Sequence, residues 1–280
     1  MAKYFLSLWA ILSALIAFEL YRLHRNPEHS MLFYLQTRHL LKAKFDLSPD
    51  PGRTLSLWFG YVGFGLMLLT NLYIIRKRLN FFRQLGVLKN WLDFHIFCGL
   101  MGPTLILFHC DFKVRGLVAI SFWSMIVSLS SGIVGRYVYT QISKLKGDFV
   151  REAEAYNRRI SALIEHKELE ISEEELAHYR TQALEAAGGR QVSNNPMMAL
   201  TSSLIGDVKM RLLSTLAPAA MGPAGELFFR EYAVNMRKAN TVDSFNRLMG
   251  YWHTFHTPFA VFMYLAAVLH IAAEFWLGAA

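Results

Sequence analysis

Two apolar stretches of equal length decide the fold of this chain. Residues 95–109 read HIFCGLMGPTLILFH and residues 256–270 read HTPFAVFMYLAAVLH. In each stretch, 14 residues separate a histidine at the start from a histidine at the end. This separation turns an α-helix about 40° short of four full turns, so both histidines lie on one helix face. It also rises about 21 Å, which places one histidine near each end of a helix that crosses a membrane.

Apolar segments of about 20 residues, long enough to cross the hydrocarbon core of a bilayer, occur five times. They cover residues 4–23, 55–75, 91–110, 116–135 and 251–273. Over the whole chain 54% of the residues are apolar and 18% are charged, a more apolar composition than that of typical soluble proteins. We therefore predict an all-α fold, a multi-pass transmembrane helical bundle of about five spans with a helical extramembrane lobe.

The first apolar segment has two interpretations. A secretory signal peptide also combines a basic start, here Lys3, with an apolar core. No small-x-small cleavage site precedes Glu19, so we interpret the segment as a retained anchor.

Basic residues near the ends of the segments predict the orientation. The side that includes the N-terminus collects 14 Lys and Arg residues, Arg237 among them, and the other side collects eight. We expect the N-terminus and the lobe on the cytoplasmic side of a bacterial cytoplasmic (inner) membrane. The net charge of +8 suits nucleic acid or anionic lipid, and the apolar content favours lipid. The bilayer, and no nucleic acid, is therefore the expected partner.

The third and fifth segments are separated by a single span, so they are expected to run parallel. His95 then lies at the depth of His256, and His109 lies at the depth of His270. Two facing helices offer two stacked pairs of imidazoles, with room between the pairs for two porphyrins. His253 is 17 residues from His270 and about 100° off its face, so it is a poorer candidate.

Haem explains why histidine occupies these positions. A buried imidazole needs a partner for both ring nitrogens, and iron at Nε2 with a backbone carbonyl at Nδ1 supplies both. Two histidines fill both axial positions of the iron, which favours electron transfer over oxygen chemistry. Cys98 and Cys110 lie on one predicted helix about 18 Å apart, too far for a disulfide, and no Cys-x-x-Cys-His motif is present. Any haem is therefore expected to be held by coordination alone.

Two glycines and the basic residues at the ends of the fourth span are further candidates for binding the cofactor, each with an alternative role. Gly99 and Gly102 would let a flat macrocycle approach the backbone, although tight helix packing explains them equally well. Arg136 at the inner end of the fourth span, and Arg115 or Lys113 at its outer end, are placed to pair with haem propionates. Interfacial anchoring of these basic side chains is the alternative.

The polar lobe divides the chain into three predicted parts. Residues 1–140 hold the first four transmembrane helices, residues 141–250 form the lobe, and residues 251–280 form the fifth helix, which completes the haem-binding bundle. The lobe contains no glycine-rich phosphate loop and no Gly-Lys-Ser motif. We expect it to pack on itself or on a partner subunit.

Spacings of three and four between apolar residues predict four helices within the lobe. They are centred on residues 149–163, 176–186, 200–212 and 226–240. Ser172 and Glu175 have the spacing of a capping box at the start of the second helix, and Gly188 with Gly189 is expected to end it.

The histidine pattern resembles the two-haem membrane cytochromes b. These include respiratory-chain cytochrome b, the cytochrome b561-like proteins and the ferric reductase-like transmembrane domains, in which paired histidines about 14 residues apart stand on two parallel helices. The resemblance covers roughly residues 55–140 and 250–275. It implies two haem b cofactors and a role in electron transfer. The axial and metal ligands it implies are His95, His109, His256 and His270.

The chain also departs from these families. No sixth span and no flavin and nicotinamide module follow the fifth span, and the Pro-Glu-Trp-Tyr motif of the respiratory quinol site is absent. The long lobe belongs to none of the three. We therefore expect an electron-transfer subunit of an oxidoreductase complex rather than a self-contained enzyme.

Two functions from different classes remain. In the first, the chain is a membrane cytochrome b subunit, of the kind found in respiratory chains, that carries electrons between a quinol or cytoplasmic donor and a redox partner on the other face. That partner is expected to be another subunit, a periplasmic c-type cytochrome or an iron-sulfur protein, and binding of quinone is left open. In the alternative, the chain is a haem-free membrane anchor or transporter subunit whose lobe recruits partners.

Overall fold

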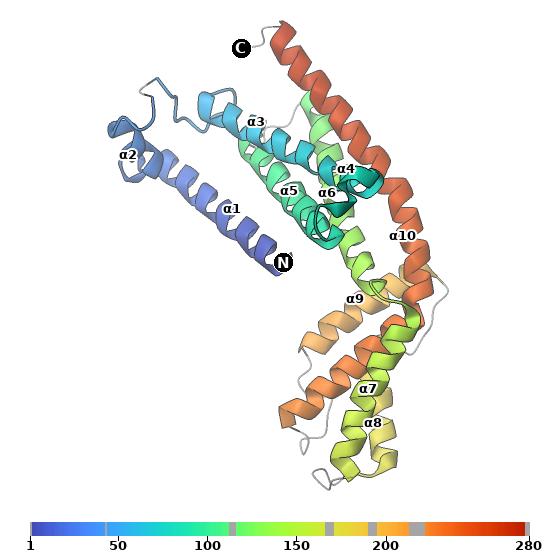
Figure 1. The fold of residues 1–280 in the computed structure, drawn as a ribbon. Helices are drawn as coiled ribbons and strands as arrows, with labels where there is room; N and C mark the ends of the chain where they lie inside the picture. The colour runs from blue at the N-terminus through green and yellow to red at the C-terminus, as the bar shows by residue number, and fades with distance from the viewer. Residues whose placement is uncertain are drawn as a thin grey trace. The chain divides into compact units, whose positions relative to one another are not determined.

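The computed structural model of the chain is all-helical, as the sequence predicts (Figure 1). It describes residues 2–42, 44–111, 116–165, 171–189, 195–212 and 222–277, and these contain no β-strand. The described helices form two compact units. The first unit comprises residues 1–132 and 257–280, and the second comprises residues 133–256.

The first unit is built from apolar helices. Its main helices are α1 (Ala2–Arg25), α2 (Met31–Thr37), α3 (Thr54–Leu69), α4 (Asn71–Arg78) and α5 (Leu88–Cys110). Two short 3₁₀ helices, η1 (Pro27–His29) and η2 (Asn80–Gln84), connect them. The unit also contains the beginning of α6 (Leu117–Gln141) and the end of α10 (Gly222–Leu277).

Among the described residues, five helical segments are long and apolar enough to cross a membrane. They are Tyr4–Arg25, Thr54–Arg78, Leu88–Cys110, Val118–Gln141 and Gly225–Trp276. Four of the five apolar segments predicted from the sequence fall within these helical segments, and the fourth segment, residues 116–135, begins two residues before Val118.

Two details differ from the sequence prediction. The second segment is not one uninterrupted helix, because the backbone tightens at Thr70, whose N–H and hydroxyl both donate to the carbonyl of Met67. The lobe helix predicted near residues 226–240 and the fifth span are one helix, α10. The polar residues between them stay helical because Thr241, Ser244 and Phe245 are buried by packing.

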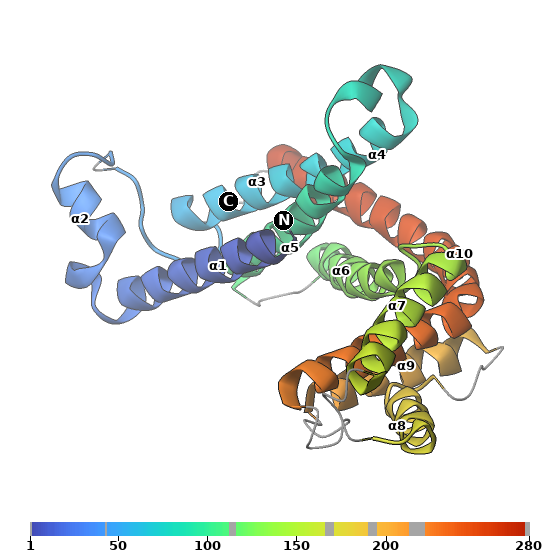
Figure 2. The same cartoon turned by 60° about the horizontal axis from the view of Figure 1, so that its bottom comes forward.

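Packing in the first unit centres on α5. Helices α1 and α3 both lie beside α5 (Figure 2). The indole N–H of Trp9 in α1 donates to the hydroxyl of Thr104 in α5 at 3.1 Å. A buried cluster of Met67, Met125 and Met263 joins α3, α6 and α10, and Ile106 of α5 packs against it.

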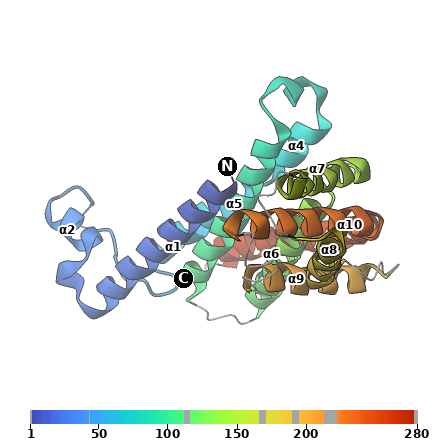
Figure 3. The same cartoon turned by 90° about the horizontal axis from the view of Figure 1, so that it is seen from below.

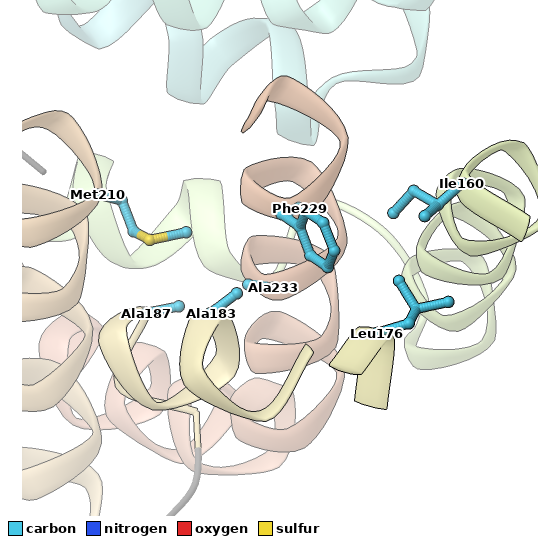
Figure 4. Close-up of a cluster of buried hydrophobic side chains, with 7 residues drawn as sticks. All are labelled: Ile160, Leu176, Ala183, Ala187, Met210, Phe229 and Ala233. Carbon is cyan, nitrogen blue, oxygen red and sulfur yellow. The ribbon is translucent and has the colours of Figure 1, made fainter. Parts of the chain in front are cut away.

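The second unit contains α7 (Lys146–Glu165), α8 (Glu173–Ala186) and α9 (Pro196–Leu212), with the end of α6 and the beginning of α10. Figure 3 shows α8 and α9 beside α10. Their core is a cluster drawn from α7, α8, α9 and α10 (Figure 4). Its buried members are Ile160, Leu176, Ala183, Ala187, Met210, Phe229 and Ala233.

The predicted ends of α8 are confirmed. The Ser172 hydroxyl accepts from the backbone N–H of Glu175, and the Glu175 carboxylate accepts from the backbone N–H of Ser172, which makes the capping box complete. After α8 the backbone of Gly188 adopts a φ of +80°, a conformation that favours glycine.

Candidate functional site

Both histidines of α5 are held by backbone carbonyls of α3 and of Thr70, the residue that follows it. The Nδ1 atom of His95 lies 2.9 Å from the carbonyl oxygen of Thr70, and Nδ1 of His109 lies 2.9 Å from the carbonyl oxygen of Ser56. Because a carbonyl oxygen only accepts hydrogen bonds, Nδ1 must carry the proton in both rings. In a neutral imidazole the lone pair is then on Nε2, the nitrogen that is suited to bind a metal.

These contacts follow from one antiparallel register between α3 and α5. Ser56 pairs with His109, Gly63 with Gly102, and Thr70 with His95. Each step advances seven residues along α3 and goes back seven along α5. The helices approach closely at the middle pair, where a Cβ on Gly102 would lie 2.9 Å from the Gly63 carbonyl oxygen.

The ring of His109 fits closely against α3. A Cβ on Gly60 would lie 2.9 Å from Nδ1 of His109 and 3.1 Å from its Cγ, so only glycine leaves this space for the ring. Ser56, which is fully buried, donates its hydroxyl to the backbone carbonyl of His109 at 2.8 Å. The ring and the backbone of His109 are thus both fixed by the same turn of α3.

His95 lies where α3 meets α10. The Thr70 hydroxyl is 3.1 Å from the hydroxyl of Tyr264, which also bonds to the carbonyl of Met67. The side-chain amide of Asn71 donates to the same tyrosine hydroxyl at 3.1 Å. Thr70, whose carbonyl accepts the hydrogen bond from His95, is therefore also in contact with Tyr264 of α10.

The midpoints of the two histidine pairs lie at the same core cluster. Gly102 is halfway between His95 and His109, and a Cβ there would lie 2.7 Å from the Cγ of Met67. Met263 is halfway between the histidines of α10, and it packs with Met67 in the buried cluster. In Figure 1, α5 and the final part of α10 run in the same direction. His109 and His270 each lie seven residues beyond this shared level.

The two histidines of α10 fall in different units. His270 belongs to the first unit, with His95 and His109, and is half-buried. His256 is the last residue of the second unit, and its ring stacks on Trp252 with the centroids 4.7 Å apart and the planes 18° apart. Stacking covers the face of the imidazole, whereas metal coordination uses the edge.

Trp252 is itself fixed against α6. Gly135 faces its indole so closely that a Cβ there would overlap the ring. Gly135 therefore makes room for the indole of Trp252, next to His256. Gly60 does the same for the ring of His109.

The other predicted cofactor residues have different surroundings. Gly102 packs against α3, as the helix-packing alternative predicts, whereas a Cβ on Gly99 would meet nothing within 4 Å. Arg136 is half-buried, with its guanidinium 5.8 Å from the ring centroid of Tyr139. Arg115 and Lys113 lie outside the described residues.

The orientation of the two α5 histidines is compatible with ligation of a haem iron. In the described part of the chain, no three His, Cys, Asp or Glu side chains gather in a way that could hold a metal ion. A bis-histidine haem needs only two protein ligands for each iron. The orientation of His95 and His109 also meets the requirement that the second ring nitrogen is bonded to a fixed acceptor.

Sequence reasoning predicted a carbonyl partner for Nδ1 but did not identify the residues that provide it. Ser56 and Thr70 are 14 residues apart, the same separation as the histidines they face, and Gly63 lies midway between them. This repeated spacing in the preceding span is the pattern that would have identified α3. No comparable spacing in the sequence identifies Tyr264 or Gly60 as part of the site.

In comparisons of the chain with protein-family models, with curated proteins and with solved structures, nothing matches. The functional argument therefore depends on the sequence pattern and on the geometry described above.

Proposed function

We propose that this chain is a membrane cytochrome b subunit that carries electrons across the bilayer through two bis-histidine haem b groups. The observation that supports this most strongly is the pair of hydrogen bonds from His95 and His109 to α3. Both bonds leave the lone pair on Nε2, and both histidines lie in a helix long and apolar enough to span a membrane. A histidine that serves only in helix packing does not require this matched orientation.

The proposed axial ligands are His95 and His256 for one haem and His109 and His270 for the other. When bound, each haem supplies an iron that takes up and releases one electron. The chain holds the ligands: the carbonyls of Thr70 and Ser56 fix the rings of His95 and His109 and raise the basicity of Nε2. The open surface at Gly99 and the guanidinium of Arg136 are proposed contacts of the macrocycle and of a propionate.

The proposed location is a bacterial inner membrane, with the five apolar helices as spans. The excess of basic residues on the side of the N-terminus favours a cytoplasmic second unit. Electrons are proposed to pass between a quinol or cytoplasmic donor and a redox protein on the opposite face, as part of a larger complex. The competing function, a haem-free anchor or transporter subunit, explains the apolar helices but not the shared orientation of the two α5 histidines.

A visible spectrum of the purified full-length protein tests the proposal. We expect a reducible b-type spectrum and about two haems per chain in a pyridine haemochrome assay. Substitution of His109 or His270 by alanine should remove one haem, and substitution of His95 or His256 should remove the other.

His253→Ala is the matched control. His253 lies on the same helix as two of the proposed ligands, is exposed, and has its Nδ1 3.1 Å from the carbonyl of Met249 in its own helix. This variant should keep both haems. Colourless protein would instead favour the haem-free anchor. Retention of both haems after all four proposed ligands are replaced would show that these histidines are not the axial ligands.

A further inference from the structure

Helix α9 carries an apolar surface that the rest of the second unit leaves uncovered. Six of its large apolar side chains are between 43% and 77% exposed. They are Met197, Met198, Leu204, Ile205, Val208 and Leu212. At about 100° per residue, these six lie within an arc of about 120°, and Thr201 is the remaining residue within it. We call this surface the α9 arc.

The opposite side of α9 faces the rest of the second unit. Its buried residues are Ala199, Ser203, Gly206 and Met210. Gly206 contacts the carbonyl of Ala187 at the end of α8, and Met210 belongs to the core cluster shared with α8 and α10. The α9 arc therefore points away from the helices that form the body of this unit.

Helix α9 crosses the end of an apolar helix. Tyr137 and Val138 are neighbours in α6. The Tyr137 hydroxyl donates to Asp207, and Val138 lies in one buried cluster with Ala199 and Phe245. Because Asp207 and Ala199 are about 12 Å apart along α9, the helix crosses α6 instead of running beside it. The apolar segment of α6 ends at residue 135, and the helix itself ends at Gln141. The crossing is thus at the level where that segment ends.

Charges at the margins of the arc favour lipid as its occupant. Lys209 and Arg211 are both exposed and flank the arc on its two sides. The one acidic residue of α9, Asp207, lies outside the arc and is bonded to Tyr137 and Arg237. An apolar surface between two cationic margins matches helices that lie in the bilayer interface, where the basic side chains extend to the headgroups.

We propose that α9 lies in the interfacial region of the chain's own bilayer, with the α9 arc turned toward the acyl chains and Lys209 and Arg211 at anionic headgroups. This inference rests on the membrane location in the proposed function and does not depend on haem. It assigns a lipid-binding surface to the second unit.

Spin labelling tests the position of the arc. The full-length Ile205→Cys variant is labelled with a nitroxide and placed in vesicles of phosphatidylcholine and phosphatidylglycerol. Cys98 and Cys110 are buried, and the labelled wild-type chain provides the background. Power saturation compares collisions with oxygen, which concentrates in lipid, and with a nickel chelate, which stays in water. We expect collisions with oxygen to dominate at position 205.

Two further positions calibrate the measurement. Leu265→Cys, on the exposed side of α10, reports lipid, and Glu154→Cys, exposed on α7, reports water. Replacement of both Lys209 and Arg211 by glutamate should shift the label at 205 toward the aqueous value. A label at 205 that behaves like the one at 154 would overturn the proposal, and so would one shielded from both reagents, because that result means that protein covers the arc. If position 265 also lacks contact with lipid, the membrane location itself is wrong.

Discussion

The ring of His109 depends on the absence of a side chain at Gly60. A methyl group there would lie 2.9 Å from Nδ1, closer than ordinary packing permits, so either the ring or α3 must move. Both movements lengthen the bond from Nδ1 to the Ser56 carbonyl, now 2.9 Å. At the scale of single residues, this contact is the most sensitive part of the proposed site.

We predict that Gly60→Ala lowers the occupancy of the haem held by His109 and leaves the haem held by His95 in place. Haem content and a redox titration of the purified variant measure this, since the two haems should titrate separately. Gly65→Ala is the control on the same helix, because a Cβ at that position would meet nothing within 4 Å. Equal haem content in the two variants would argue against the proposed role of Gly60.

At the scale of elements, the pairing of α3 with α5 depends on the close approach of Gly63 and Gly102. Gly102→Ala places a methyl group against Met67 and against the Gly63 carbonyl. We expect a loss of about 1–3 kcal/mol in the free energy of unfolding, as for other overpacked cores. Thermal or denaturant unfolding in detergent measures it.

The matched control for that experiment is Gly99→Ala in the same helix. The added methyl group meets open space, so we expect the stability of the haem-free protein to stay unchanged. Haem binding should fall only if the macrocycle lies against Gly99. Loss of stability in this variant equal to that of Gly102→Ala would contradict the packing described for the two glycines.

The capping box of α8 gives a prediction that depends on pH. Hydrogen bonds from the backbone N–H and the hydroxyl of Ser172 lower the pKa of the Glu175 carboxyl. A carboxyl whose pKa is lowered by folding stabilises the folded state above its unfolded pKa, and this contribution is lost as the pH falls through the folded value. Ser172→Ala should therefore weaken the first turn of α8 at neutral pH, as expected for a lost N-cap.

Amide hydrogen exchange in the first turn of α8 measures this effect. Exchange should be faster in Ser172→Ala than in the wild type, and the difference should shrink once Glu175 is protonated. A difference that is constant across the acid range would show that the carboxylate takes no part in the cap.

The elements that the sequence predicts correctly are those with local causes. Apolar length predicts the five candidate spans, and the side chains of Ser172 and Glu175 predict the start of α8 because capping involves neighbours in the chain. The partner of Nδ1 in His95 is different, because it depends on the register of another helix. The continuity of α10 likewise has no local cause, since it depends on the tertiary burial of Thr241, Val242, Ser244 and Phe245.

At the scale of the whole molecule, the second unit is organised around Arg237, a basic residue that the sequence suggests is at the surface. Arg237 was counted among the basic residues at the membrane surface, but its side chain is fully buried. It forms an ion pair with Asp207 at 2.7 Å and donates to the carbonyls of Ala187 and Ser203. One side chain thus connects α8, α9 and α10. Sequence alone records the charge of a residue and not its burial.

We predict that Arg237→Ala destabilises the second unit by about 3–5 kcal/mol, because it breaks a buried ion pair and leaves two carbonyls without their donor. Asp207 is 29% exposed, so its own uncompensated charge is partly hydrated and the effect should lie toward the lower limit. Proteolysis of the full-length protein measures the opening of this unit. Arg158→Ala, at an exposed position on α7, should behave as the wild type does.

The use of main-chain oxygens to hold the two imidazoles of α5 has an evolutionary consequence. No point mutation deletes a carbonyl, so replacement of Ser56 or Thr70 by another small residue keeps the acceptor of the imidazole and loses only the bond made by the hydroxyl. Mutation can, however, change the distance between α3 and α5, because glycines set that distance where the helices meet. Among descendants of this chain, purifying selection should therefore fall on Gly60, Gly63 and Gly102 more heavily than on either hydroxyl.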